Sequence, residues 1–260
     1  MTKIASPSKR SPLKAAPLRT AGQSIEEEIL RIVAEDTSAY ISFSIFIIIF
    51  TAYEWYRWLT NFPPKPFTFS FLAVTMLTYF VYKTVLAKRK IKNLKQARDG
   101  EKAVGEFLER FREQGYRVFH DIVGGNFNID HLLIGKTGIY TIETKTLSKP
   151  IKGKTEIQYD GNQVKINGHT PERDPIVQAK AQASWVKELL RDLTGKVYKV
   201  QPVVLYPGWF IKQPSGAEVW VLNPKALTGF LEKHDARIDE SSIHPIATHL
   251  SRYVRNLKRH

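Results

Sequence analysis

Two carboxylates and a lysine in the middle of the chain have types and a spacing that suit the hydrolysis of phosphodiester bonds. Asp130 stands in one apolar string, and Glu143 and Lys145 stand in the next. Because Glu143 and Lys145 are two residues apart, a strand would direct both side chains to the same face. The turn expected at Gly135–Gly138 would bring Asp130 across the ladder. The three side chains are therefore predicted to converge at one edge of a sheet.

The chemistry of this trio depends on a cation. Two buried carboxylates repel each other unless a positive charge lies between them. Mg²⁺ (or Mn²⁺) fits, because hard divalent ions prefer carboxylate oxygens and keep positions open for water and phosphate. Lys145 could orient the attacking water and stabilise charge on the phosphate. A pattern this short also matches solvated polar positions on a half-exposed sheet, so both interpretations stand at this level.

The elements that must position these residues alternate between strand and helix patterns. Apolar residues at helical spacing from Val104 to Phe111 predict an amphipathic helix that ends near Gly115. Strands are expected over 116–122, 128–134 and 139–145, as an antiparallel meander, with a further hairpin over 155–166. Asp174-Pro175 predicts a helix start, followed by strands over 198–206 and 219–222 and helices from about 225 and 243. This order predicts an α/β fold with a mixed β-sheet flanked by helices.

The stretch from about Gly100 to about Leu231 resembles the nuclease-related domain (NERD) family of the PD-(D/E)xK nuclease superfamily. The most specific part is Asn128-Ile-Asp-His through Ile142-Glu-Thr-Lys145, which looks like the central motif of the family. Gly100-Glu101 resembles the motif of the opening helix. Asp174-Pro175 with Gln178 resembles the start of the following helix. Ile129 stands where the superfamily name places proline, a position that carries no chemistry.

The resemblance implies a restriction-endonuclease-like core and a role for each motif residue. Asp130 and Glu143 would be metal ligands, helped by the backbone carbonyl of Thr144. Lys145 would be the catalytic lysine. Glu101 would point into the site from the first helix, and Gln178 would sit at its mouth. His131, next to Asp130, would point to the opposite face of the strand as a packed or surface histidine.

Composition indicates a polyanionic partner and excludes thiol chemistry. The chain has 260 residues with a formal net charge of +14. Such an excess favours nucleic acid, DNA or RNA, or an anionic membrane surface as a partner. The chain has no cysteine, which excludes a disulfide partner and any cysteine-built zinc site.

Two charge-free apolar stretches, 37–53 and 66–82, predict a transmembrane helical hairpin. Each would cover about 26 Å as a helix, and aromatic and lysine flanks supply the rest of a ~30 Å hydrocarbon core. The loop between them carries Pro63-Pro64. Basic residues flank both outer ends, so the positive-inside rule predicts a multi-pass protein of the cytoplasmic (inner) membrane with both termini and the soluble domain in the cytoplasm. The alternative is a pair of buried core helices.

The predicted organisation has five parts. They are a disordered basic tail (1–23), a short amphipathic helix (24–36), the transmembrane hairpin (37–87), a basic linker (88–99) and the nuclease-related domain with C-terminal helices (100–260). The short amphipathic helix could lie on the membrane surface or pack against the soluble domain.

Two functions follow from these patterns. The first is a membrane-anchored, Mg²⁺-dependent hydrolase of DNA or RNA phosphodiester bonds. The second is a non-catalytic membrane-tethered module that binds nucleic acid or protein on a nuclease-like fold. The presence of both acids and the lysine favours the enzyme.

Overall fold

The chain separates into two compact units in the computed structural model, which describes residues 17–61, 63, 66–125, 127–149 and 156–257. One unit is Gly22–Gly100, and the other joins Met1–Ala21 to Glu101–His260. Most of the predicted basic tail, residues 1–16, lies outside the described residues.

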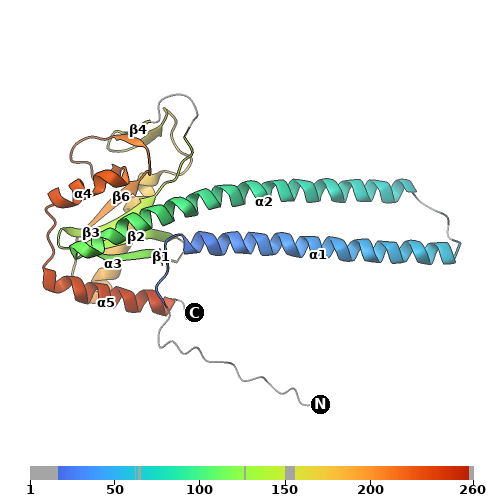
Figure 1. Cartoon of the computed structure of the whole chain (residues 1–260), viewed down its shortest axis with the longest axis horizontal. Helices are drawn as coiled ribbons and strands as arrows, with labels where there is room; N and C mark the ends of the chain where they lie inside the picture. Colours follow the sequence, from blue (N-terminus) through green and yellow to red (C-terminus); the bar gives the residue numbers. More distant parts are fainter. Residues whose placement is uncertain (1–16, 62, 64–65, 126, 150–155, 258–260) are drawn as a thin grey trace, which may run out of the picture. The chain divides into compact units, whose positions relative to one another are not determined.

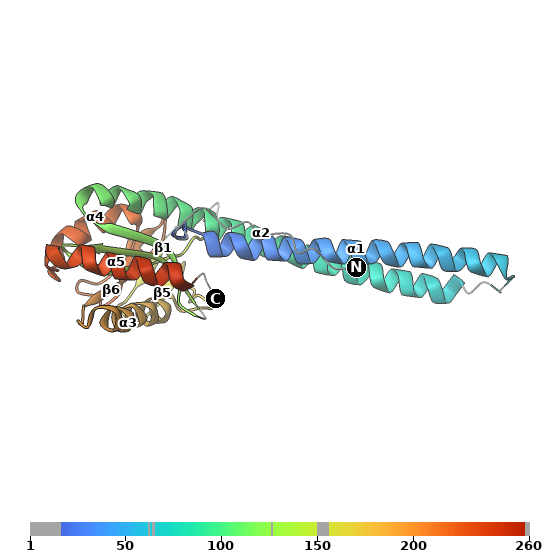
Figure 2. The same ribbon diagram turned by 90° about the horizontal axis from the view of Figure 1, so that it is seen from below.

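The first unit contains α1 (Gln23–Leu59) and α2 (Pro66–Glu109) up to Gly100, and these two long helices run side by side in Figures 1 and 2. The Phe80 ring packs against Tyr40 and Phe43, with ring centroids 4.9 and 5.5 Å apart. Each helix contains an apolar stretch of 18 residues that is not buried in the structure. The mean hydropathy of this stretch is 1.6 in α1 and 1.4 in α2. By length and composition, both helices could therefore span a membrane.

Helix continuity corrects two predicted boundaries. The amphipathic helix expected at 24–36 is the first part of α1, and the linker expected at 88–99 is helical and continues in α2 to Glu109. Neither stretch contains proline or an internal glycine, and residues such as lysine, arginine, leucine and glutamate form helices readily. Glu28 pairs with Lys90 at 2.7 Å, so this part of α1 packs along α2. The two expected positions were the membrane surface and the soluble domain, and neither included this packing.

The second unit is built on a mixed five-stranded sheet in the order β1-β2-β3-β6-β8. β1 (Arg117–Val123), β2 (Asn128–Gly135) and β3 (Gly138–Thr144) form the predicted antiparallel meander. β6 (Val200–Leu205) and β8 (Trp220–Leu222) extend the sheet in parallel. The site strand β3 therefore lies at the centre of the sheet, buried along its whole length.

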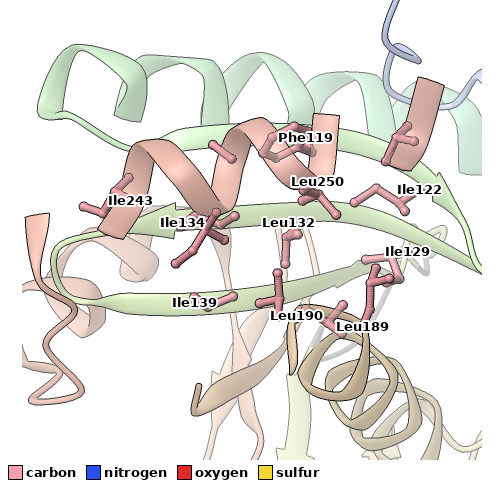
Figure 3. Close-up of a cluster of buried hydrophobic side chains, with 14 residues drawn as sticks. Phe119, Ile122, Ile129, Leu132, Ile134, Ile139, Leu189, Leu190, Ile243 and Leu250 are labelled. Carbon is pink, nitrogen blue, oxygen red and sulfur yellow. The ribbon is translucent and has the colours of Figure 1, made fainter. Parts of the chain in front are cut away.

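Helices cover both faces of this sheet. α3 (Pro175–Thr194) and α5 (Glu240–Leu257) pack on one face, where Leu190 and Leu250 join Leu132 and other strand residues in a buried cluster (Figure 3). The end of α2, the 3₁₀ helix η1 (Arg110–Gln114) and α4 (Pro224–Lys233) cover the other face, through Leu108, Leu227 and their neighbours. Figure 2 shows the sheet between α3 and the end of α2. The predicted fold class is confirmed.

A second, three-stranded sheet lies beside the first, in the order β5-β4-β7. β4 (Glu156–Tyr159) and β5 (Val164–Ile166) are the expected hairpin. β7 (Phe210–Lys212) was not predicted from the sequence, because its three residues show no alternation and its pairing with β4 is non-local. Ile157, Trp209 and Val219 are among the buried residues that pack this sheet against the first turn of α3.

The segment Pro17–Ala21, named here the N-terminal arm, packs onto the second unit. Leu18 contacts the cluster beneath α5, and Arg19 Nε lies 2.6 Å from Asp121 Oδ2 in a buried ion pair. Gly105 permits the approach of the arm, because a Cβ atom there would lie 2.7 Å from the Cβ of Ala21. These contacts correct the expectation of a disordered tail for its last residues.

Candidate active site

Glu143 and Lys145 form an ion pair at the carboxyl end of β3. Lys145 Nζ donates to Glu143 Oε1 at 2.7 Å and to Gln178 Oε1 at 2.9 Å. The Glu143 side chain is 5% exposed and that of Lys145 is 26% exposed. The carboxylate is therefore buried, while the ammonium group lies within reach of solvent.

Gln178 and Gln182 reach Glu143 from α3. Asp174 begins this helix as predicted, accepting a hydrogen bond from the backbone N–H of Ile176 at 2.8 Å. Gln178 Nε2 donates to Glu143 Oε1 at 2.8 Å, and Gln182 Nε2 donates to Glu143 Oε2 at 2.6 Å. Residues four apart share a helix face, so this spacing could have identified Gln182, which sequence analysis missed.

Asp130 lies next to these groups on β2. His131 pairs with Ile142 in the antiparallel ladder, which brings the preceding residue of β2 to the end of β3. Asp130 Oδ2 accepts a hydrogen bond from the backbone N–H of Thr144 at 2.7 Å. Burial raises the pKa of Asp130 well above its usual value, and the charges of Glu143 and Glu101 raise it further. The Thr144 N–H and the Lys145 charge act in the opposite direction.

Glu101 contributes charge from the last part of α2. Its side chain is 9% exposed, and its carboxylate is close enough to raise the pKa of Asp130. The structure thus brings Asp130, Glu143, Lys145 and Gln178 into direct or electrostatic contact, with Glu101 nearby and the Thr144 backbone bound to Asp130.

His131 belongs to a separate cluster on the sheet face covered by the end of α2. It is fully buried, and its Nδ1 atom lies 2.9 Å from Nδ1 of His120. His120 Nε2 in turn lies 2.8 Å from Glu109 Oε1. Burial lowers the pKa values of both histidines, and each neighbouring charge modifies the effect less than burial does. The expectation of a packed histidine away from Asp130 agrees with this position.

Metal-binding side chains are sparse in the part of the chain that the structure describes. Over the described ranges, no group of three or more His, Cys, Asp or Glu side chains is arranged to hold a metal ion. The metal ligands implied by the family resemblance are two carboxylate side chains, Asp130 and Glu143, and one backbone oxygen, the carbonyl of Thr144. Such a set does not require three acidic or histidine side chains.

Fold and site together define an α/β protein with buried carboxylates and a partly exposed lysine at the end of a central strand. Residues 96–207 match the family model described as nuclease-related domain, a range that contains all the site residues. This part of the chain is therefore similar to the nuclease-related domain family.

Other comparisons add less. A solved structure of SfsA from Pyrococcus furiosus in complex with Ca²⁺ is similar at 16% identity and a TM-score of 0.23, over 46% of this chain and 52% of SfsA. The chain thus spans about half the length of that protein. Curated protein sequences gave no match.

Proposed function

We propose that this chain is a membrane-anchored, metal-dependent nuclease that hydrolyses phosphodiester bonds of DNA or RNA. The observation that supports it best is the contact of Lys145 with Glu143 and Gln178 beside the buried Asp130. The match of residues 96–207, which include this cluster, to the nuclease-related family model supports a nuclease-type role. The charge excess of +14 favours association with a polyanion.

A divalent cation fits the donor set. Asp130, Glu143 and the Thr144 carbonyl would hold Mg²⁺ or Mn²⁺, and all three supply oxygen, the ligand such ions prefer. The raised pKa of Asp130 supports this fit, because burial and then the charges of Glu143 and Glu101 raise it, and a nearby cation would favour the ionised form. When bound, the cation would stabilise negative charge that develops on the phosphate.

Lys145 is the residue best placed to act on the reacting phosphate. An ammonium group has three N–H donors, and Glu143 Oε1 and Gln178 Oε1 use two of them. The third donor can contact the attacking water or a non-bridging phosphate oxygen. Because two acceptors fix the ammonium group in advance, it need not reorganise as charge develops.

The two long apolar helices would anchor the domain to a lipid bilayer. They have the length and hydropathy of membrane spans, and the first 22 residues carry five basic and no acidic residues. By the positive-inside rule, both ends of the hairpin would face the cytoplasm.

The test is a cleavage assay of the full chain in detergent micelles, against single- and double-stranded DNA and RNA, with Mg²⁺, Mn²⁺ or EDTA. We expect metal-dependent cleavage by the wild type. Lys145→Ala should lower kcat by roughly 10²- to 10⁴-fold while Mn²⁺ binding measured by calorimetry is retained. Lys145→Arg should not restore the rate, because guanidinium does not replace a compact ammonium group. Equal rates for wild type and Lys145→Ala would refute the assignment.

The non-catalytic module is the second candidate, and one observation favours it. No group of three metal-binding side chains occurs in the part of the chain that the structure describes. A wild type that binds nucleic acid with steep salt dependence, yet cleaves none of the four substrates with either metal, would favour this candidate.

A further inference from the structure

We propose that Gln182 is a positioning residue of this site, which orients the Glu143 carboxylate so that its Oε2 atom is available to a divalent cation. The inference rests on the proposed function and assigns a role to a residue outside the family motif. Gln182 lies on α3, is 1% exposed and follows Gln178 by four residues.

The Gln182 amide makes two donations. Nε2 donates to Glu143 Oε2 at 2.6 Å and to the backbone carbonyl of Asn128 at 2.9 Å. The amide orientation follows from these partners, because a flipped amide would face two acceptors with its own oxygen. The Gln182 Oε1 atom has no hydrogen-bond partner among the described residues, so the two donations alone fix the side chain.

The hydrogen bonds to Glu143 distinguish its two oxygens. Oε1 accepts from Lys145 Nζ and Gln178 Nε2, which fills both of its lone-pair positions. Among the described residues, Oε2 accepts only from Gln182, so one acceptor position remains open there. Gln182 therefore sets the direction of the oxygen that can still bind a cation.

The same amide connects the two strands that carry the carboxylates. Glu143 is near the end of β3, and Asn128 begins β2 two residues before Asp130. A donor shared between these strands holds the two carboxylates at a fixed separation. Metal-site residues of this kind typically affect metal affinity or activity by about 10- to 100-fold.

Three variants of the full chain in detergent micelles separate positioning from stability. Gln182→Met keeps the length of the side chain and removes the donor. Gln182→His restores a ring N–H donor. The matched control is Gln201→Met, because Gln201 is also buried, at 7% exposure, and donates to two backbone carbonyls, those of Pro202 and Glu218.

The first readout is Mn²⁺ affinity by calorimetry, followed by kcat and KM for nucleic acid. We expect Gln182→Met to weaken Mn²⁺ binding by about 10- to 100-fold and to lower kcat at fixed Mn²⁺, with KM unchanged. Gln182→His should recover part of the affinity, and Gln201→Met should bind Mn²⁺ like the wild type. Equal Mn²⁺ affinity for wild type and Gln182→Met would overturn the inference while leaving the proposed function standing.

The second readout needs neither metal nor activity. Melting temperatures are measured in EDTA for Gln182→Met, Glu143→Ala and the double variant. If Gln182 holds Glu143, the loss caused by Gln182→Met should shrink in the Glu143→Ala background, whereas additive losses overturn the inference. A wild type that binds no Mn²⁺ but shows this coupling refutes the proposed function and retains the positioning role.

Discussion

The raised pKa of Asp130 links the stability of the folded chain to pH. Its raised pKa means that the folded chain keeps a proton over a pH range in which the unfolded chain has lost it. By linkage, this group makes the folded state less stable as pH rises above its unfolded pKa of about 3.9. At neutral pH this carboxyl group therefore destabilises the metal-free protein.

Asp130→Asn is expected to stabilise the metal-free protein at neutral pH. The amide cannot ionise, and it keeps an acceptor for the Thr144 N–H. Melting temperatures in EDTA should be higher for the variant by a few degrees at pH 7 to 8, and the difference should vanish below about pH 4. Asp160→Asn is the control, because backbone N–H groups lower the pKa of that exposed carboxyl group. Its removal should therefore lower the melting temperature at neutral pH, not raise it. A difference that does not change with pH would contradict the assignment.

The site residues differ in how far the sequence could predict them. Asp130, Glu143 and Lys145 followed from strand alternation and one turn, and Gln178 from the family resemblance. For Gln182, the spacing of four from Gln178 indicates a shared helix face, but its contact with Glu143 depends on the rotation of α3 against β3, which local patterns leave open. The hydrogen bond from Thr144 N–H to Asp130 likewise depends on the final register of β2 and β3.

At the scale of elements, periodicity predicted most strands and helices. The main error was to divide segments that form one continuous helix. A change from apolar to basic residues near 88 indicated a linker, yet both compositions form helix, so α2 continues through it. β7 was missed for a different reason. Its three residues become a strand only because β4 lies beside them.

The pairing of β1 with β2 contains a pH-sensitive element. His120 and His131 are opposite each other in the ladder, and burial lowers both pKa values below 6.5. The unfolded chain therefore binds more protons than the folded chain, so stability should be lost as pH falls through about 6.5. Glu109, Arg112 and Asp121 are the charged groups that act on His120.

His131→Leu should reduce this acid sensitivity. Between pH 7.5 and 5.5 we expect the melting temperature of the wild type to fall, and that of the variant to fall less, even if the variant is less stable at both pH values. Asp130 acts in the opposite direction but equally in both proteins, so the difference in slope reports the histidine pair. The control is the exposed His169→Asn. Parallel pH profiles for wild type and His131→Leu would show that the pair does not titrate on unfolding.

At the scale of the whole molecule, the basic charge is uneven. Residues 101–260 contain 24 basic and 18 acidic residues, whereas residues 1–22 contain five basic and no acidic residues. One of these five basic residues, Arg19 of the N-terminal arm, is buried in an ion pair with Asp121 and does not lie on the surface. The N-terminal arm, Pro17–Ala21, is thus a structural part of the second unit.

Arg19→Ala should destabilise this unit strongly. It would remove an ion-pair partner of Asp121, which is 2% exposed. Breaking a buried pair by removing one partner costs about 3–5 kcal/mol, and the double variant Arg19→Ala with Asp121→Asn should recover part of the loss. Urea denaturation of the full chain in micelles measures both. Arg237→Ala is the control, because Arg237 lies 87% exposed. A loss no larger than that of the control would show that the arm contributes little.

The membership of the arm in the second unit also leads to a prediction about membrane topology. The arm and the chain from Glu101 onward belong to one compact unit, so the chain leaves this unit through α1 and returns to it through α2. If both helices span a bilayer, their outer ends share one side, and Thr60 at the connection lies on the other. Because the chain contains no cysteine, single substitutions Ser11→Cys, Thr60→Cys and Lys196→Cys can be labelled without background. In intact cells, a membrane-impermeant maleimide should label only Thr60→Cys, and in inside-out vesicles only the other two. Labelling of Ser11→Cys and Lys196→Cys from opposite sides would contradict the shared unit, and labelling of all three in intact cells would contradict the cytoplasmic orientation.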